Sequence, residues 1–452
     1  MSRLFGTDGV RGVANAELTP ELAFRVGRAA ASLLPSESHR APLLVGRDTR
    51  LSGTMLEAAI IAGITSVGRD AVSLGIVPTP AVACITRREG AAAGVVISGS
   101  HNPIADNGIK FFGSDGFKLS DELEDRIEAL LDSDDLPRPT GTAIGVARVS
   151  QNLARHYYTE LYEGDPDLRG LHAVVDCGCG AAYAIAPYAL RKLGAKVTEL
   201  NCENDGARIN VECGATDLRA LQAAVRAKIA EGEQRVVGVA FDGDADRALF
   251  VDETGAVRSG DHVMFALARQ MQARRELKDE TVVATVMSNI GFERALLRYG
   301  IRLIRTPVGD RCVLERMRDG EYTLGGEQSG HIVDFRYNTT GDGPRTAVTL
   351  LAMVAAGDAS LHELVREVVN APQVLVNVRT SNREILTAPG VRDEIAAAEA
   401  ALAGSGRLLI RPSGTEPLIR VMAEGDDRVL VEMVAGRVAA RIEQEIERYP
   451  ST

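Results

Sequence analysis

Residues Ala173–Leu200 read AVVDCGCGAAYAIAPYALRKLGAKVTEL and join two short apolar runs through a segment rich in alanine and leucine. Ala173–Asp176 is short and apolar, as expected for a buried strand, and Lys196–Leu200 predicts a second strand. Ala184–Leu193 has the length and composition of a helix. Together they form a β–α–β unit, which places this part of the chain in the α/β class.

The same alternation of strands and helices continues on both sides of this unit. Pro20–Leu34 predicts a helix, because Thr19 can cap its N-terminus and Pro20 suits the first helical position. The other elements expected before the unit are the strand Leu43–Gly46, the helix Met55–Val67, and the strands Ala71–Leu74 and Gly94–Ile97. Those expected after it are the strand Arg235–Phe241, the helix Asp261–Arg274, the strand Thr281–Thr285, the helix Glu293–Tyr299 and the strand Arg302–Thr306.

The chain has 452 residues, which is enough for two to four domains. The polar segment Asp134–Gly145 predicts a linker. From Asn370–Val374 onward the chain is first rich in strands and then helical over Asp427–Glu447, which predicts a smaller α+β unit. The sequence thus suggests three α/β units followed by a smaller one, with no exact repeat among them.

Composition excludes several classes of protein. Lys and Arg total 51 and Asp and Glu total 62, so the net charge is −11, and neither nucleic acid nor an anionic membrane is expected as a partner. Six cysteines do not make a disulfide framework, and the first residues contain no apolar stretch of signal-peptide length. The best membrane candidate, Ala71–Thr86, is too short and contains Pro78 and Pro80. We therefore expect a soluble protein of the cytoplasm.

The segment Ile97-Ser98-Gly99-Ser100-His101-Asn102-Pro103 forms a polar turn after a predicted strand. The carboxyl end of a strand is the usual place for a site in an α/β protein, but such a turn can equally satisfy only its own backbone. Neither serine has the Gly two residues before and after it that a hydrolase nucleophile elbow requires. Ser100 therefore needs a metal, a base or prior phosphorylation in order to react.

The segment Asp242-Gly243-Asp244-Ala245-Asp246-Arg247 has carboxylates at alternate positions after a strand. Carboxylates at this density repel one another unless a cation binds, and their hard oxygen ligands suit Mg²⁺. Calcium binding of the EF-hand type is excluded, since Arg247 occupies the sixth position, where Gly is required. A solvated acidic turn is the alternative interpretation.

Two later segments offer groups for a polar ligand. Gly325–His331 contains Glu327, Ser329 and His331, which can bind a hydroxylated ligand, and His331 can exchange protons near neutral pH. By itself, this segment is at least as typical of a plain turn as of a ligand-binding site. Arg411-Pro412-Ser413-Gly414-Thr415-Glu416-Pro417, with Arg420, offers hydroxyls, an open backbone and two guanidinium groups, which suit a phosphate or a sulfate. Surface salt bridges are the alternative there.

Three other types of site lack a residue, a motif or a spacing that they require. Asp176–Gly180 follows a strand as a dinucleotide-binding turn does, but Tyr183 occupies the third glycine position. No segment has the GxxxxGK[ST] pattern of a P-loop kinase. Four cysteines lack the spacing of a zinc site and are expected to be structural thiols: Cys177, Cys179, Cys202 and Cys213.

Taken together and in this order, the segments resemble the α-D-phosphohexomutase superfamily. The matching segments are GTDGVRG (6–12), SGSHNP (98–103), NGIKFF (107–112), DGDADR (242–247), PVGDRCV (307–313), GEQSGHI (326–332), YNTTGDG (337–343) and RPSGTEPLIRVM (411–422). The resemblance runs from Phe5 to beyond Glu424. It implies an α/β fold of four domains around a central cleft: three similar mixed-sheet α/β domains and a smaller α+β C-terminal domain. The implied bounds are 1–150, 151–255, 256–370 and 371–452.

The resemblance also implies roles for individual residues. Ser100 is the implied phosphoserine. The ligands implied for one Mg²⁺ are a phosphate oxygen on Ser100 and the carboxylates of Asp242, Asp244 and Asp246. The residues implied near the transferred phosphoryl group are Arg11, Lys110, Arg247 and, as an acid or a base, His331. Those implied to contact the sugar are Glu327 and Ser329. Those implied to bind the other phosphate are Arg411, Ser413, Gly414, Thr415 and Arg420.

The activity implied by the resemblance is an intramolecular phosphotransfer of the isomerase class. The motifs favour conversion of glucosamine 6-phosphate to glucosamine 1-phosphate through a phosphoserine and glucosamine 1,6-bisphosphate, in support of UDP-N-acetylglucosamine and cell-wall synthesis. A mutase for mannose or glucose phosphates is the alternative. A Mg²⁺-dependent sugar phosphatase is a rival, but it has no need of a second phosphate site at 411–420. A silent sugar-phosphate sensor would not need Ser100 and Lys110. The oligomeric state stays open, with a homodimer as one candidate.

Two positions depart from the pattern of the superfamily. Gly99 stands where Ala is usual between the two serines, and Cys179 stands where Asn is common. Gly at position 99 is expected to loosen the turn. Neither change removes a group implied in catalysis, so the implied activity is unaffected.

Overall fold

The computed structural model describes residues 3–6, 8–34, 41–413 and 417–448. Within this part of the chain the strands form four separate sheets. The chain divides into two compact units, of which the first comprises residues 1–285 and 304–365 and the second residues 286–303 and 366–452. Among the described residues, no helix has both the length and the hydropathy needed to span a bilayer.

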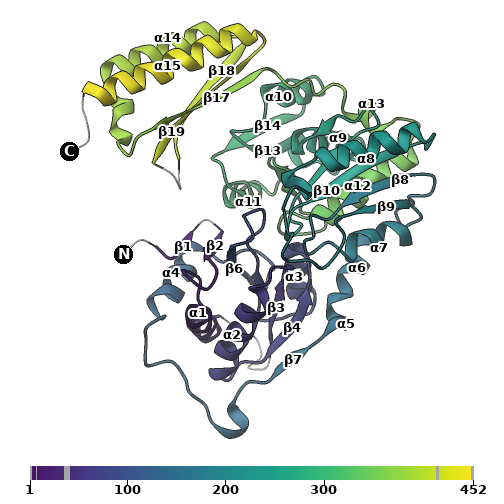
Figure 1. Cartoon of the computed structure of the whole chain (residues 1–452), viewed down its shortest axis with the longest axis vertical. Helices are drawn as coiled ribbons and strands as arrows, with labels where there is room; N and C mark the ends of the chain where they lie inside the picture. Colours follow the sequence, from purple (N-terminus) through teal and green to yellow (C-terminus); the bar gives the residue numbers. More distant parts are fainter. Residues whose placement is uncertain (1–2, 7, 35–40, 414–416, 449–452) are drawn as a thin grey trace. The chain divides into compact units, whose positions relative to one another are not determined.

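The first sheet has the strand order β1-β2-β6-β5-β3-β4-β7 (Figure 1). Strands β5, β3, β4 and β7 pair in parallel, whereas β1, β2 and β6 pair antiparallel, so the sheet is mixed. Its strands are Phe5–Gly6 (β1), Gly9–Val13 (β2), Leu43–Arg47 (β3), Ala71–Ile76 (β4), Ala93–Ile97 (β5), Asp106–Gly113 (β6) and Ala147–Val149 (β7). The helices packed with it are Pro20–Leu33 (α1), Gly53–Ser66 (α2), Thr79–Arg88 (α3) and Asp121–Ala129 (α4).

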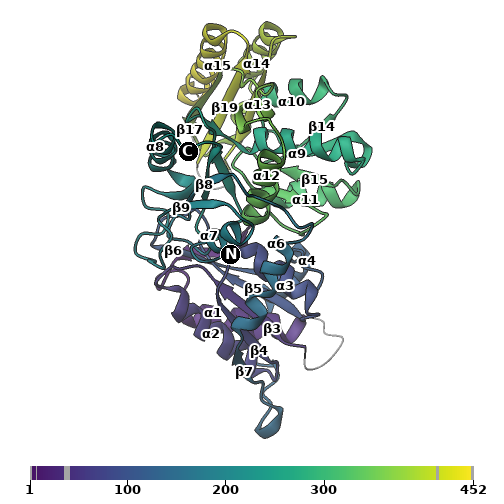
Figure 2. The same ribbon diagram turned by 90° about the vertical axis from the view of Figure 1, so that its right-hand side faces the viewer.

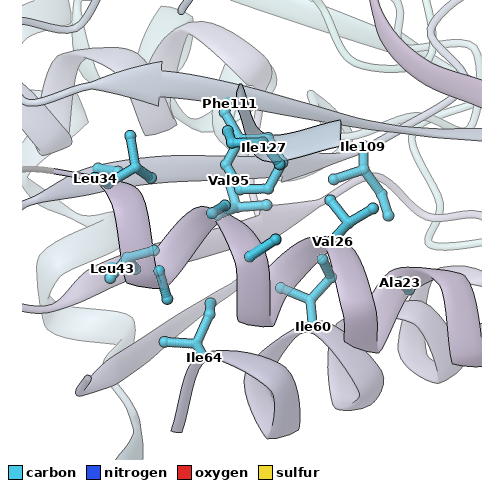
Figure 3. Close-up of a cluster of buried hydrophobic side chains, with 14 of the residues drawn as sticks. Ala23, Val26, Leu34, Leu43, Ile60, Ile64, Val95, Ile109, Phe111 and Ile127 are labelled. Carbon is cyan, nitrogen blue, oxygen red and sulfur yellow. The ribbon is translucent and has the colours of Figure 1, made fainter. Parts of the chain in front are cut away.

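Helices α1, α2 and α4 bury one face of this sheet in a continuous apolar core. Figure 3 shows Val26, Ile60 and Val95, from α1, α2 and β5, pointing into the same cluster. Each is fully buried, and burial of such a side chain contributes about 1.5–3 kcal/mol. A Cβ at Gly63 would lie 2.2 Å from the carbonyl oxygen of Phe24, so the two helices can approach this closely only because Gly63 has no side chain.

Helix α3 covers the opposite face of the first sheet. A Cβ at Gly94 of β5 would lie 2.8 Å from a methyl group of Val82 in α3. Since successive residues of a strand face opposite sides, Gly94 contacts α3 while Val95 contacts α1 and α2. Both faces of β5 are therefore covered, and the turn that follows this strand is held by a rigid layer.

The second sheet has the order β12-β11-β10-β8-β9. Strand β8 pairs in parallel with β9 and β10, whereas β10, β11 and β12 pair antiparallel. Its strands are His172–Asp176 (β8), Lys196–Leu200 (β9), Val236–Phe241 (β10), Ala248–Val251 (β11) and Val257–Arg258 (β12). Nearby helices are Gln151–Ala154 (α5), His156–Leu161 (α6), Ile185–Lys192 (α7) and Arg219–Ala230 (α8). The expected β–α–β unit is confirmed as β8, α7 and β9.

The third sheet has the order β14-β13-β15-β16. Strand β15 pairs in parallel with β13 and antiparallel with β16. Its strands are Thr281–Thr285 (β13), Arg302–Thr306 (β14), Leu324–Gly326 (β15) and Ile332–Asp334 (β16). The helices of this region are Gly260–Arg274 (α9), Ile290–Leu297 (α10), Asp310–Asp319 (α11), Gly343–Ala356 (α12) and Leu361–Val365 (α13).

The C-terminal part is a smaller α+β unit. Its strands are Gln373–Arg379 (β17), Gly406–Pro412 (β18) and Leu418–Gly425 (β19), with β19 central and antiparallel to both neighbours. Helices Pro389–Leu402 (α14) and Arg428–Arg448 (α15) lie side by side along one face of this sheet in Figures 1 and 2. Segment 286–303 belongs to the same unit, and Arg407 Nη2 donates to the carbonyls of Val286 and Ser288, each at 2.8 Å.

The elements expected from the sequence are present, and their ends differ from the expected ones by at most three residues. The hydroxyl of Thr19 accepts a hydrogen bond from the amide of Leu22 at 3.2 Å, so the predicted helix cap is confirmed. The rejected membrane segment, Ala71–Thr86, forms β4 and most of α3. Short 3₁₀ helices occur at Gly141–Ala143 (η1), Gly214–Thr216 (η2), Lys278–Glu280 (η3) and Arg383–Thr387 (η4). The four sets of domain bounds stay a prediction.

Candidate active site

Ser100 lies in the turn between β5 and β6 and is almost completely buried, with 1% of its surface exposed. Its φ is 50°, in the left-handed region, and such a conformation costs a residue other than glycine roughly 1–3 kcal/mol. Its amide donates to the hydroxyl of Ser98 at 2.8 Å, and its own hydroxyl donates to Asp242 Oδ2 at 2.8 Å. The turn therefore presents one buried hydroxyl to the acidic segment 242–246.

The carboxylates of Asp242, Asp244 and Asp246, here called the Asp triplet, follow β10 in a buried loop. Their exposed fractions are 0%, 1% and 6%, and one oxygen of each lies within 4.8 Å of the others. Burial and the neighbouring carboxylates raise the pKa of Asp242 well above its usual range. In the described part of the chain, Oδ1 of Asp244 and Oδ1 of Asp246 are buried without a hydrogen-bond partner. This donor set fits a hard divalent cation such as Mg²⁺.

Two groups from outside the loop hold Asp244. The hydroxyl of Thr79, at the start of α3, donates to Asp244 Oδ2 at 2.6 Å, and Lys110 Nζ, from β6, donates to the same oxygen at 3.3 Å. Lys110 is 2% exposed, and its Nζ also lies 3.0 Å from Asp8 and 3.9 Å from Asp246. Burial opposes the charge of Lys110, but Asp244 and Asp8 raise its pKa. Lys110 is thus a fixed cation beside the Asp triplet.

Arg11 and Arg247 bring two guanidinium groups to the same place. Arg11, on β2, pairs with Asp8, and its Nη1 donates to Asn102 Oδ1 at 3.2 Å in the Ser100 turn. The amide of Arg247 donates to Asp242 Oδ1 at 3.2 Å, and its Nε lies 3.8 Å from Asp246 Oδ1. Both arginines therefore lie beside the buried hydroxyl or the carboxylates that face it.

The turn between β15 and β16 contains Glu327, Ser329 and His331. The amide of Glu327 donates to the carbonyl of His331 at 2.9 Å, which closes the turn. His331 Nε2 lies 3.8 Å from Oδ2 of Asp246 and 3.8 Å from Oδ2 of Asp310. Within the described chain, both ring nitrogens of His331 and the hydroxyl of Ser329 are buried without a hydrogen-bond partner, so these polar groups are available to a ligand.

A second charged cluster comprises Asp8, Lys118 and Asp310, none of which had a role expected from the sequence. Lys118 Nζ donates to Asp8 Oδ1 at 2.7 Å and to Asp310 Oδ2. Burial would raise the pKa of Asp8, but Lys110, Lys118 and Arg11 hold it well below its usual range. Asp8 and Asp310 lie in segments that match the superfamily, so the resemblance could have indicated a role for these two residues. Their pairing through Lys118 joins residues 110 and 192 positions apart and has no counterpart in local sequence.

The two departures from the superfamily pattern each have a local structural consequence. A Cβ at Gly99 would lie 2.8 Å from Cζ of Arg50, so glycine lets this guanidinium pack directly against the turn. Cys179 has a φ of 51°, and its carbonyl accepts a hydrogen bond from the hydroxyl of Thr49 at 2.5 Å. The cysteines weighed as a zinc site are free thiols, and among the described residues the Asp triplet is the single group with three or more metal-ligating side chains.

The second compact unit contains the residues expected to bind a phosphate. Arg411 of β18 lies directly opposite Arg420 of β19. Burial and the charge of Arg420 lower the pKa of Arg411, and like charges opposite each other destabilise a strand pair. Ser413 follows β18, and its carbonyl accepts a hydrogen bond from Arg383 Nη2 at 3.3 Å. Paired guanidinium groups of this kind suit an anion with several oxygens. Gly414 and Thr415 lie outside the described residues.

Models of the phosphoglucomutase/phosphomannomutase family match the chain in four successive segments. They describe α/β/α domain I at residues 2–138, α/β/α domain II at 156–255, α/β/α domain III at 259–371 and the C-terminal domain at 375–441. The expected organisation of three α/β domains and a smaller C-terminal domain is thereby confirmed.

Curated relatives match over nearly the whole chain. The phosphoglucosamine mutase of Caldanaerobacter subterraneus subsp. tengcongensis is 51% identical over 453 residues, which cover 99% of this chain and 100% of that protein. The phosphoglucosamine mutase of Symbiobacterium thermophilum is 50% identical over 452 residues, which also cover 99% and 100%.

Solved structures show the same fold at lower identity. A phosphoglucomutase/phosphomannomutase family protein from Burkholderia thailandensis has a TM-score of 0.83 at 23% identity and covers 100% of this chain and 99% of its own. N-acetylphosphoglucosamine mutase of Aspergillus fumigatus, in complex with GlcNAc-6P and magnesium, has a TM-score of 0.66 at 18% identity, with 98% and 95% covered. By its four domain matches and its full-length relatives, the chain belongs to the phosphoglucomutase/phosphomannomutase family.

Proposed function

We propose that this protein is a phosphoglucosamine mutase, an isomerase that interconverts glucosamine 6-phosphate and glucosamine 1-phosphate, with Ser100 as the residue that carries the transferred phosphoryl group. The observation that carries the proposal is the 2.8 Å hydrogen bond from the buried Ser100 hydroxyl to Asp242 of the Asp triplet. The full-length relatives with 50–51% identity are phosphoglucosamine mutases, which supports this substrate over mannose or glucose phosphates. A cytoplasmic location is part of the proposal.

The metal in this proposal is one Mg²⁺, held by Asp242, Asp244, Asp246 and an oxygen on Ser100. Support comes from the spacing of the three carboxylates and from the buried Oδ1 atoms of Asp244 and Asp246 that have no partner in the described chain. When bound, a divalent cation offsets the carboxylate charges and stabilises negative charge on phosphoryl oxygens.

The chain's own residues would then perform two phosphoryl transfers. In the first, the free hydroxyl of the sugar phosphate attacks phosphorus on phosphorylated Ser100, the bond from phosphorus to Ser100 Oγ breaks, and His331 accepts the hydroxyl proton. In the second, Ser100 Oγ attacks the other phosphate of the 1,6-bisphosphate, the bond from that phosphorus to the sugar oxygen breaks, and His331 returns the proton to this sugar oxygen. Lys110, Arg11 and Arg247 would stabilise charge on the phosphoryl group as it moves.

Specificity in this proposal comes from two further groups of residues. Glu327 and Ser329 would bind the sugar, since both lie in the turn that also contains His331. Arg411, Ser413 and Arg420, with Gly414 and Thr415, would bind the phosphate that is not transferred. A phosphatase that removes one phosphate gains nothing from this second anion site, which is why the guanidinium pair favours a mutase.

Incubation of the purified protein with glucosamine 6-phosphate, Mg²⁺ and a trace of the 1,6-bisphosphate tests the proposal. Phosphorus NMR should show glucosamine 1-phosphate and no growth of inorganic phosphate. Inorganic phosphate without the 1-phosphate would mean a phosphatase. Parallel incubations with glucose and mannose phosphates test the substrate, and a faster rate on either would replace glucosamine phosphate as the main substrate.

A further inference from the structure

Among the described residues of the first compact unit, Arg50 has the largest fully buried side chain, and it is not one of the residues proposed to act in catalysis. Its side chain has no exposed surface, and its neighbour Asp48 has none either. A guanidinium group has five N–H donors, and a buried one needs a partner for each of them. The acceptors of these five donors therefore indicate the structural role of Arg50.

Four of the five donors of Arg50 are used on carbonyl oxygens of the Ser100 turn. Nη2 donates to the carbonyls of Ser100 at 2.9 Å and Asn102 at 2.8 Å. Nη1 donates to the carbonyls of Pro103 at 2.5 Å and Asp106 at 2.9 Å. One planar group thus fixes the path of the backbone from residue 100 to residue 106.

The fifth donor connects Arg50, through Asp48 and Ser98, to the backbone amide of Ser100. Its Nε donates to Asp48 Oδ2 at 3.0 Å, and the same oxygen accepts a hydrogen bond from the Ser98 hydroxyl at 2.6 Å. The Ser98 hydroxyl in turn accepts from the amide of Ser100 at 2.8 Å. Arg50 and Asp48 therefore hold both the N–H and the carbonyl of Ser100.

The conformation that these contacts hold is unfavourable in isolation. Ser100 has a positive φ, and only surrounding structure that over-determines a residue keeps it there. Its carbonyl accepts a second hydrogen bond, from Asn210 Nδ2 at 2.8 Å, which comes from the region of the second sheet. A Cβ at Gly99 would lie 2.8 to 3.0 Å from three atoms of the Arg50 guanidinium, so the group packs flat against the turn.

We propose that Arg50 is a positioning residue that holds Ser100 in its left-handed conformation and so aims the Ser100 hydroxyl at Asp242. The predicted effect on kcat rests on the proposed function. The effect of Arg50 on the conformation of Ser100 does not depend on which substrate is bound. Arg50 has no exposed surface and all its donors are used within the protein, so it acts through Ser100 and not by binding substrate.

Arg50→Lys tests the inference, because Lys keeps the charge beside Asp48 but cannot replace the planar fork that reaches four carbonyls. We expect kcat for glucosamine 6-phosphate to fall about 30- to 100-fold, with KM changed less than about threefold, since a small displacement of a reacting group is costly and the substrate contacts are intact. Hydrogen exchange of amides in 98–108 should become at least about tenfold faster, while exchange in β10 stays unchanged.

Arg345→Lys is the matched control. Arg345 is also buried and donates to backbone carbonyls, those of Glu160 and Glu163, but it has no contact with the Ser100 turn. Its variant should lose stability and keep wild-type kcat and wild-type exchange in 98–108. If Arg50→Lys does not fold, Ser98→Ala tests the inference in its place. It removes the link between Asp48 and the Ser100 amide, and kcat should fall about tenfold with KM unchanged.

Wild-type kcat and unchanged exchange of 98–108 in Arg50→Lys would overturn the inference, as would unchanged kcat in Ser98→Ala where that variant decides. A fall in kcat equal to that of Arg345→Lys would also overturn it, because the effect would then be general instability. If the wild-type protein makes no glucosamine 1-phosphate, the proposed function fails. The exchange measurement alone then decides whether Arg50 holds the turn.

Discussion

Two clusters of carboxylates in the first compact unit differ in how far the protein's own cations compensate their charge. Asp8 and Asp310 share the ammonium group of Lys118. Burial would raise the pKa of both, but Lys110, Lys118 and Arg11 hold that of Asp8 below its usual value, and Lys118 does so for Asp310. In the Asp triplet, burial and mutual repulsion raise the pKa of Asp242 and Asp246, whereas Lys110 and the hydroxyl of Thr79 lower the pKa of Asp244. The residue type is the same, so the direction of each pKa shift depends on how buried the carboxylate is and on the cations that the protein places beside it.

This difference separates a cluster that stabilises the fold from one that is built for a ligand. A buried carboxylate paired with lysine has its charge compensated within the chain, and removal of one partner leaves an uncompensated charge. In the Asp triplet, Lys110 compensates Asp244, but Asp242 and Asp246 keep a raised pKa and are fully compensated only when a cation binds.

Ser100→Ala should abolish turnover, because it removes the hydroxyl that links the Asp triplet to the substrate. Loss of a covalent nucleophile predicts a fall in kcat of more than about a thousandfold. Phosphorus NMR of product formation measures it, and intact mass should show no phosphate retained after incubation with the bisphosphate. Ser32→Ala, on α1 with its hydroxyl bonded to the Arg28 carbonyl, is the control. Substantial turnover by Ser100→Ala would place the nucleophile elsewhere.

Asp246→Asn should separate activity from stability. It removes one carboxylate of the Asp triplet, so kcat should fall about a hundredfold through weaker Mg²⁺ binding. Without metal, the variant should melt at a higher temperature than the wild type, because one repulsive charge is gone.

Thermal melting with and without Mg²⁺ checks this prediction. A ligand that binds the folded state raises the melting temperature, so Mg²⁺ should stabilise the wild type and have a much smaller effect on Asp246→Asn. Asp167→Asn, at an exposed position, should respond to Mg²⁺ as the wild type does. An equal response in Asp246→Asn would show that the Asp triplet is not the metal site.

Arg411→Ala tests a cluster of positive charge, the cross-strand pair Arg411 and Arg420. If Arg411 and Arg420 face each other in order to bind phosphate, the variant should raise KM about 10- to 30-fold while leaving the folded state as stable as before, since like-charge repulsion is relieved. Steady-state kinetics and thermal melting measure both quantities. Unchanged KM would remove the pair from the phosphate site.

Asp310→Asn should show the opposite signature from Asp246→Asn. It takes one carboxylate from the cluster in which Lys118 compensates charge, so the free energy of unfolding should fall by about 1–3 kcal/mol. Urea denaturation at neutral pH measures this loss. A stability gain on removal of this carboxylate would mean that the cluster around Lys118 is not balanced in charge.

Cys179→Asn should have the smallest effect. Cys179 is in the left-handed region, which Asn tolerates better than most residues, so the variant should be more stable by up to about 1 kcal/mol. Urea denaturation measures the gain. Cys84→Asn, at a buried helical position, should be destabilising and shows that Asn itself does not stabilise. A loss of stability in Cys179→Asn would mean that packing of the thiol outweighs the backbone preference.

Much of the fold and part of the candidate site could be predicted from local sequence. The cap at Thr19 and Pro20 at the first helical position predicted the helix α1, and the alternating Asp residues after a strand predicted the Asp triplet. Such features depend on neighbours within a few residues, which is why they are visible in a chain met for the first time.

The role of Arg50 could not be predicted in this way. Its partners Ser100, Asn102, Pro103 and Asp106 lie 50 to 56 residues away and offer backbone carbonyls, which every residue has. The same holds for Asn210, whose bond to the Ser100 carbonyl spans 110 residues. Nothing in the type of the acceptor marks it in the sequence, so only the folded chain identifies the pair.

The sequence by itself determined which chemistry this protein can perform: a hydroxyl, three carboxylates and several cations in segments that resemble one superfamily, within an α/β chain. The tertiary structure decided which carboxylates lie beside a lysine, which ones keep a raised pKa, and how Ser100 is held against Asp242. The reason is physical. Residue types and short-range patterns are properties of the chain, whereas burial, charge balance and a strained backbone conformation arise only when distant segments pack together.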